Sequence, residues 1–169
     1  MKQKLLASII TLLSCTTSAI AQDNIDREVE GIVLGKHVKV QAARILQSRG
    51  FHVGSKVWDF KSKPEEQPTL LQDTVVFLGE TWDGELFNAT ADKVVYRFCY
   101  TKENKTEKEI DDSFKAVLVQ LNEKYKVHNI EQTDYYATYS DQRTEISLWK
   151  TTDTSLRLCY QVLNFDEIE

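Results

Sequence analysis

The spacing of hydrophobic residues predicts two amphipathic helices in this chain. Apolar residues recur at intervals of three and four from Ile110 to Tyr125, which places them on one face of a helix. Thr106 and Glu109 have the spacing of a capping box, so this helix should begin just after Thr106. A shorter pattern with the same period predicts a first helix over residues 38–49, which Gly50 ends.

Alternation of apolar and polar residues predicts strands in the remaining chain. The predicted strands cover residues 51–60, 74–79, 86–89, 94–101, 135–139, 144–150 and 155–163. The residues Trp82-Asp83-Gly84-Glu85 have the composition of a hairpin turn, with Gly84 at the position that needs a positive φ. Further turns are expected at residues 140–142 and 151–153.

These elements predict an α+β fold: an antiparallel sheet of about six or seven strands with two helices on one face. Each predicted helix has a single apolar stripe, so both can pack on the same side of the sheet and leave the other side partly exposed. Residues 96–100 (YRFCY) and 156–160 (LRLCY) share one pattern, and each closes a helix-plus-strands unit. The chain is therefore a candidate for an internal duplication.

The N-terminal segment is typical of a secretory signal peptide. Lys2 and Lys4 precede an uncharged apolar run over residues 5–13, and Ala19 and Ala21 fit a cleavage site after Ala21. The alternative is a lipobox that ends at Cys15, which would make this residue the lipidated N-terminus of an outer-membrane lipoprotein.

The rest of the chain, residues 22–169, has the size of one domain. Both prolines of the chain fall within a stretch that we expect to be a mobile loop near residues 61–72. With 21 Lys and Arg against 26 Asp and Glu, the formal charge is -5, which disfavours a nucleic-acid partner. No stretch after the signal peptide is apolar enough to span a bilayer.

Cys99 and Cys159 occupy matching positions in the two similar strands, beside Arg97 and Arg157. Alternation places all four of these side chains on the sheet face opposite the apolar one. In an oxidising compartment the two thiols can form a disulfide if their strands are neighbours, and otherwise they stay unpaired. The absence of a Cys-x-x-Cys motif argues against a redox enzyme.

The sequence contains no recognisable catalytic or metal-binding motif. The three histidines lack the spacing of zinc ligands, and no nucleophile elbow or phosphate-binding glycine loop is present. Many carboxylates lie on the predicted second helix, where exposed acidic residues are ordinary. We therefore predict neither a cofactor nor a metal, and a protein that is not an enzyme.

Aromatic residues in the predicted strands suggest a binding surface. Trp149 alternates with Ile146 and Leu148 and should point away from the core, on the same face as Arg157. Exposed Trp and Tyr residues on a sheet are common in binding faces. The predicted binding residues are Trp149 and Arg157, with Arg97 on the same face and Trp82 at the rim. Alternatively, these aromatics pack beneath the proline-containing loop or the N-terminal arm.

Several glycine-containing segments resemble a family of small exported bacterial proteins of unknown activity. The resemblance covers most of the chain after the signal peptide and is carried by GIVLG at residues 31–35, SRGF at 48–51, FLG at 77–79 with Gly84, and LNEKY at 121–125. Members often have glycine after this Lys-Tyr, whereas this chain has Lys126. The order of elements is similar to the beta-lactamase-inhibitor-protein-like fold, also found in small outer-membrane assembly lipoproteins. The resemblance implies that the open sheet face binds a protein partner.

The sequence thus favours an exported binding module, periplasmic or secreted, whose open sheet face docks a protein or another cell-envelope component. A hydrolase that uses carboxylates to act on envelope polymers is the alternative, and it requires a pocket with two acids whose pKa values are shifted apart. A purely structural lipoprotein anchored at Cys15 is a third interpretation.

Overall fold

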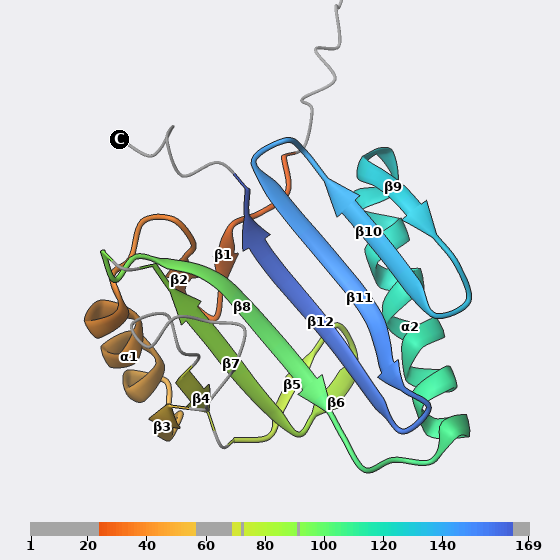
Figure 1. Ribbon diagram of the computed structural model, residues 1–169, viewed down its shortest axis with the longest axis horizontal. Helices are drawn as coiled ribbons and strands as arrows, with labels where there is room; N and C mark the ends of the chain where they lie inside the picture. The colour runs from red at the N-terminus through yellow and green to blue at the C-terminus, as the bar shows by residue number, and fades with distance from the viewer. Residues whose placement is uncertain (1–23, 57–68, 72, 91, 164–169) are drawn as a thin grey trace, which may run out of the picture.

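Eight antiparallel strands form the main sheet of the computed structural model, which describes residues 24–56, 69–71, 73–90 and 92–163 (Figure 1). From one edge to the other the strands are β3 (Val53–Lys56), β4 (Thr69–Leu71), β7 (Gly84–Ala89), β8 (Val95–Lys102), β12 (Ser155–Val162), β11 (Thr144–Thr152), β10 (Tyr136–Ser140) and β9 (Asn129–Gln132). Helices α1 (Lys39–Ser48) and α2 (Glu107–Tyr125) complete an α+β fold, as the sequence predicted.

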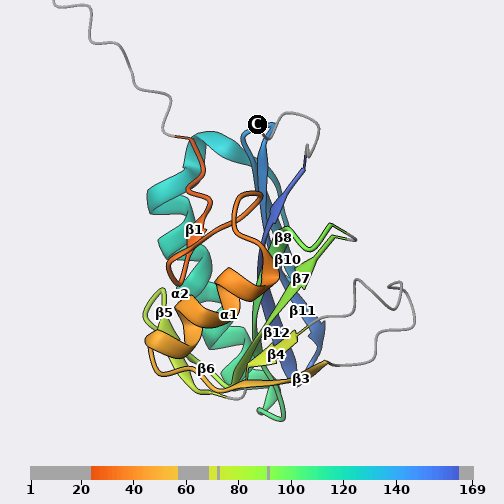
Figure 2. The same ribbon diagram turned by 90° about the vertical axis from the view of Figure 1, so that its left-hand side faces the viewer.

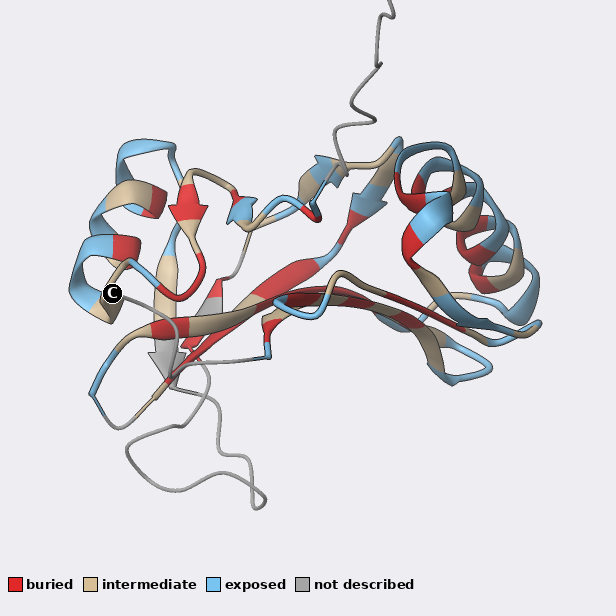
Figure 3. Ribbon diagram, turned by 90° about the horizontal axis from the view of Figure 1, so that it is seen from above, coloured by how far each residue is buried: buried red, intermediate tan, exposed pale blue. Residues whose placement is uncertain are grey.

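Both helices lie on one face of the sheet. Figure 2 shows the sheet nearly edge-on, with α1 and α2 on the same side. Two small hairpins lie on this side as well: β1 (Glu28–Val29) with β2 (Ile32–Val33), and β5 (Val75–Phe77) with β6 (Glu80–Trp82). Seen from above, the helices stand at the two ends of the sheet and the hairpins lie between them (Figure 3). This helix-bearing side contains the hydrophobic core.

The strand order shows two successive units, each with one helix and four strands of the main sheet. The first unit supplies β3-β4-β7-β8 and the second supplies β9-β10-β11-β12. Their last strands, β8 and β12, pair with each other in the middle of the sheet, and Cys99 lies directly opposite Cys159. Each unit therefore extends outward from the central pair in the reverse of its chain order.

Helix α2 begins and ends where its sequence predicts. The Thr106 hydroxyl accepts a hydrogen bond from the Glu109 amide at 3.3 Å, and the Thr106 amide donates to the Glu109 carboxylate at 2.8 Å. This capping box satisfies amides that the first turn leaves without partners. The 3-10 helix η2 (Lys126–His128) follows directly. The side of α2 facing the sheet buries Ile110, Phe114, Val117, Leu121 and Tyr125.

The tight turn near β6 differs from its prediction. Trp82 ends β6 and Gly84 begins β7, but these two strands pair with different partners and form no hairpin. The hairpin connects β5 to β6 through Leu78 and Gly79, whose φ angles are 51° and 74°. Two central residues with positive φ are the requirement of a type I′ turn.

Other boundaries also differ from the predictions. Residues Thr69–Leu71 form β4, so the predicted loop near residues 61–72 contains a strand at its end. Neither β9 nor the β1–β2 pairing within the acidic N-terminal segment was predicted. The predicted signal peptide, the alternative lipidation site at Cys15 and most of the proline-containing loop lie outside the described residues.

Candidate functional site

The side of the main sheet that faces away from both helices, here called the outer face, carries most of the predicted binding residues. Directly paired residues of neighbouring strands project from the same face of a sheet. Since Phe98 and Leu158 belong to the core, their neighbours along each strand project outward. One row of paired outward residues crosses five strands: Tyr136, Trp149, Arg157, Thr101 and Gly84.

Three side chains of this row form a continuous contact surface. Trp149 on β11 is paired with Tyr136 on β10 and with Arg157 on β12. The Arg157 guanidinium carbon lies 6.0 Å from the centre of the Trp149 ring, which is within the range of a cation–π interaction. All three residues are partly exposed. Within the described part of the chain, no helix or strand lies over the outer face (Figure 2).

A shallow groove of about 400 Å³ lies beside the Trp149 ring. It is lined by Tyr135, Tyr136, Ser147, Trp149 and Lys150. Tyr135 is 63% exposed, so its ring is accessible to a partner. Lys150 is already paired with Asp111 of α2, so the aromatic rings provide most of the free surface.

Tyr135 and Tyr136 also belong to this surface, although they were not among the predicted binding residues. Alternation along residues 135–139 places aromatic residues on both faces of the strand, so it does not show which of them lies beside Trp149. The register between β10 and β11 decides this, because it pairs Tyr136 with Trp149 and leaves Tyr139 in the core.

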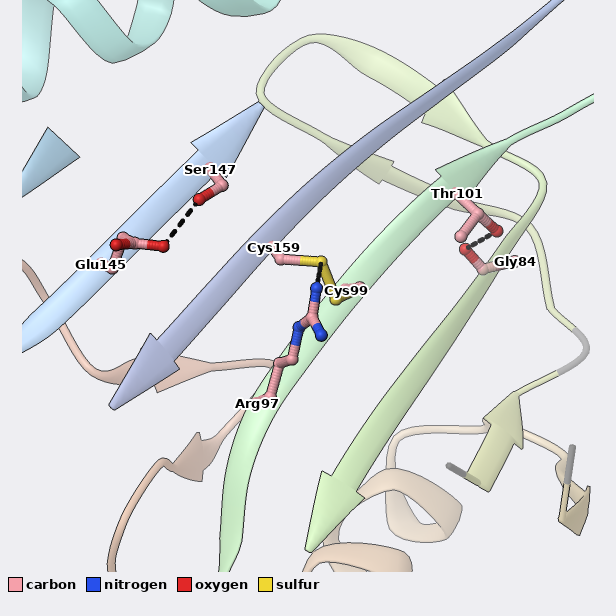
Figure 4. The surroundings of a disulfide bond; sticks show 7 residues. All are labelled: Gly84, Arg97, Cys99, Thr101, Glu145, Ser147 and Cys159. Atoms are coloured by element: carbon pink, nitrogen blue, oxygen red, sulfur yellow. Dashed lines mark hydrogen bonds between the residues drawn. A yellow bond between two sulfur atoms is a disulfide. The ribbon is translucent and has the colours of Figure 1, made fainter. Parts of the chain in front are cut away.

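The predicted disulfide is present: Cys99 and Cys159 are bonded across β8 and β12 on the outer face (Figure 4). Both cysteines are almost completely buried. A terminal nitrogen of Arg97 lies 3.5 Å from the Cys159 sulfur. Arg97 therefore shares the outer face with Arg157, as predicted, but it belongs to a different row, paired with Gln161 and Asn88.

The prediction that Trp82 lies at the rim of the binding face is wrong. Trp82 is completely buried on the helix-bearing side, and its indole nitrogen donates a hydrogen bond to the Phe77 carbonyl at 3.0 Å. Its ring packs against Tyr100 with 5.7 Å between ring centres. Because Trp82 ends β6 of the small hairpin instead of turning into β7, its ring faces the core.

A second concave region lies on the helix-bearing side, between the β1–β2 hairpin, the end of α1 and β5. This hollow has a volume of about 910 Å³. Four of its lining residues are acidic, and one, Arg49, is basic; the acidic residues are Asp26, Glu28, Glu30 and Asp73. Glu30 accepts hydrogen bonds at 3.0 Å from both Arg49 and the Tyr100 hydroxyl.

Glu85 lies beneath this hollow. Its side chain is completely buried, and neither carboxylate oxygen has a hydrogen-bond partner among the described residues. Burial, together with the nearby charges of Glu30 and Asp73, raises the pKa of Glu85 to about 8. The hydrogen bond from the exposed His52 lowers the pKa of Asp73.

The pKa values of Glu85 and Asp73 are shifted in opposite directions, which is the pattern that the hydrolase interpretation requires. Glu85, however, is covered by the protein and is absent from the surface that lines the hollow. A general acid must come within hydrogen-bond reach of its substrate, so this geometry does not support the hydrolase interpretation.

Comparison with known proteins identifies no relative: no family model, curated protein or solved structure matches the chain. The resemblance to the beta-lactamase-inhibitor-protein-like fold therefore remains a prediction.

The described residues contain no group of three or more His, Cys, Asp and Glu side chains arranged to hold a metal ion. In the same part of the chain, neither helix has the length and hydrophobicity needed to cross a bilayer.

Proposed function

We propose that this protein is an exported, non-enzymatic binding module that docks a protein or another cell-envelope component on its outer face. The observation that carries the proposal is the row of Tyr136, Trp149 and Arg157, which is partly exposed beside a groove lined by aromatic rings. Aromatic and arginine side chains that are held in place before binding are the residue types that dominate binding energy in protein interfaces. The disulfide is consistent with an oxidising compartment outside the cytoplasm.

The rigidity of the surrounding sheet favours this function. Trp149 lies on β11, which pairs with β12 along most of its length, and the disulfide joins β12 to β8 on the same face, two residues along from Arg157 and Thr101. A binding residue on a well-supported strand loses little conformational freedom when its partner docks. A surface held in place in this way does not need a deep pocket to bind a partner.

Site-directed photocrosslinking in cells tests the proposal. A photoreactive residue in place of Ser147, which lines the groove, should crosslink to a discrete partner from the cell envelope. The same residue at Lys108, on the exposed side of α2, provides the control position. Crosslinking at both positions to the same species, or at neither, would contradict docking on the outer face.

Substitutions in the row test which residues carry recognition. Combining Trp149→Ala with Arg157→Ala should weaken binding of the crosslinked partner by about 30-fold or more, because central aromatic and arginine residues commonly act as hot spots. A matched control combines Lys115→Ala with Val119→Ala, which removes one cation and one exposed apolar side chain from α2. Equal affinity of both double variants would count against the proposed surface.

The site of the mature N-terminus distinguishes a released module from an anchored one. Mass spectrometry of the exported protein should find an unmodified chain that begins at Gln22. A diacylated Cys15 at the N-terminus would instead show that the protein is held at a membrane by lipid.

A further inference from the structure

The acidic hollow on the helix-bearing side has more negative charge than its own cations balance. Arg49 pairs with Glu30, with 3.0 Å between nitrogen and oxygen, and His52 pairs with Asp73 at 2.8 Å. Among the described residues, no cation forms an ion pair with Asp26 or Glu28, although both carboxylates line the hollow. Carboxylates gathered around a concavity attract cations, because the surrounding protein focuses their field.

Glu85 provides a second observation that does not depend on the surface charge. Its Cα partners across the sheet are Tyr100 on β8 and Leu71 on β4, so its carboxyl projects toward the helix-bearing side. Tyr100 donates its hydroxyl to Glu30 in the wall of the hollow, and Asp73 follows Leu71 by two residues. The Glu85 carboxyl therefore lies on the same side of the sheet as the hollow, beneath the residues that line it.

A buried carboxyl without a partner is costly, and native structures rarely contain one. Its charged neighbours, Glu30 and Asp73, are themselves acidic and raise this cost. A positive charge placed in the hollow would offset the repulsion between Glu30 and Asp73, and it would lower the cost of a negative charge on Glu85. A cation in the hollow would therefore lower the electrostatic cost of gathering these carboxyl groups.

The walls of the hollow indicate what kind of cation fits. Phe51, Val75 and Phe77 supply partly buried apolar surface beside the carboxylates. An alkyl stem can pack on such surface while its charged end meets the carboxylates. A bare metal ion suits this arrangement poorly, since the described residues provide no cluster of three metal-ligating side chains.

We propose that the hollow bounded by the β1–β2 hairpin, the end of α1 and β5 binds an organic cation, an alkylammonium or guanidinium group on an apolar stem. Such a group ends the lysine and arginine side chains of a basic peptide, and it also occurs in free polyamines. The hollow lies on the helix-bearing side, whereas Trp149 and Arg157 lie on the outer face, so this site is independent of the proposed docking function.

Calorimetric titration of the full exported chain with two probes tests the proposal. Spermidine represents a free polyamine, and a tetralysine peptide represents basic side chains. At least one probe should bind saturably with a dissociation constant of about 1 mM or lower. The tighter probe then identifies the source of the cation. Failure of both probes to saturate would overturn the proposal.

Variants separate a specific site from general attraction to an acidic protein. Glu28→Gln combined with Asp73→Asn should weaken binding of the tighter probe by about tenfold, since two carboxylates in the walls lose their charge. Glu107→Gln combined with Glu123→Gln removes the same net charge from the exposed side of α2 and should change affinity by less than about twofold. Equal losses in the two double variants would show that only the overall charge attracts the probe.

Amide chemical shifts of the unmodified protein give a test that needs no variant. Titration with the tighter probe should shift the signals of Gly31, Gly50 and Val76, which line the hollow at three of its sides. Shifts confined to residues outside the hollow would place the cation elsewhere and contradict the proposal.

Discussion

Trp149 and Arg157 are directly paired across β11 and β12, and the guanidinium carbon lies 6.0 Å from the centre of the indole ring. Because this contact is partly exposed to solvent, we expect it to contribute little to folding. Arg157→Ala should lower the free energy of unfolding by less than about 1 kcal/mol, measured by urea denaturation. A loss of binding in this variant would then reflect recognition. A decrease of more than about 2 kcal/mol would instead assign Arg157 a structural role.

The disulfide should stabilise the fold strongly, because it closes a sequence separation of 60 residues. Replacing Cys99 and Cys159 together by alanine should lower the free energy of unfolding by about 2–4 kcal/mol. Guanidinium titration of this variant, beside the parent protein with and without a reductant that breaks the bond, measures the effect. If the double variant were as stable as the oxidised parent, the bond would have no stabilising role.

Glu85 should make the protein less stable as the pH rises. The pKa of Glu85 is about 8 in the folded chain against 4.5 for an ordinary glutamate, so the folded state keeps a proton that the unfolded state loses. Below about pH 4.5, Glu85 is protonated in both the folded and the unfolded state, and its burial causes no loss of stability from ionisation. As the pH rises from about 4.5 to about 8, the free energy of unfolding should decrease by about 2–4 kcal/mol. Burial is the main cause of the raised pKa, and the negative charges of Glu30 in the N-terminal hairpin and Asp73 in the segment after β4 add to it.

Glu85→Gln tests this pH dependence, since glutamine has nearly the same shape and does not ionise. Urea denaturation between pH 5 and pH 8 should give a flatter stability profile for the variant than for the parent protein. Glu107→Gln, an exposed change on α2, should leave the profile unchanged. A profile for Glu85→Gln that decreases as steeply as that of the parent would contradict the raised pKa.

Lys102 forms a buried network whose disruption should be costly. Its ammonium donates to the Glu80 carboxylate at 2.5 Å and to the Ser113 hydroxyl at 2.7 Å, and its side chain is only 8% exposed. Glu80→Ala removes the countercharge and should lower the free energy of unfolding by about 3 kcal/mol.

A matched control breaks an exposed pair instead. Lys108→Ala removes the pair between Lys108 and Asp112 on the surface of α2, and we expect no measurable change in its urea midpoint. If Glu80→Ala were equally neutral, the ammonium of Lys102 would find sufficient hydration or another partner without Glu80.

The local pattern was sufficient to predict some elements. The capping box and the repeated apolar spacing placed both ends of α2, because helix formation depends on residues close in sequence. Alternation along β8 and β12 assigned Cys99 and Cys159 to one face, and their bond confirms this assignment. The apolar stripes of α1 and α2 predicted that both helices lie on one side, as Figure 2 shows.

Features that depend on contacts distant in sequence could not be predicted in this way. The residues around Trp82 in the sequence have the composition of an exposed turn. Only the pairing of β6 with β5 places its ring in the core. The turn that makes this pairing uses Leu78 at a positive φ, a position that usually favours glycine or asparagine. The orphaned carboxyl of Glu85 also depends on segments that meet only in the folded chain.

The disulfide between Cys99 and Cys159 joins the two halves of the chain in the middle of the sheet, so it should keep them together after a cut between them. The link between β8 and α2 includes the exposed residues Glu103 and Asn104, where a protease can reach the backbone. Cleavage there would separate the polypeptide into two pieces that migrate as one species until a reductant is added. The disulfide would thus hold the two halves of a cleaved molecule together covalently.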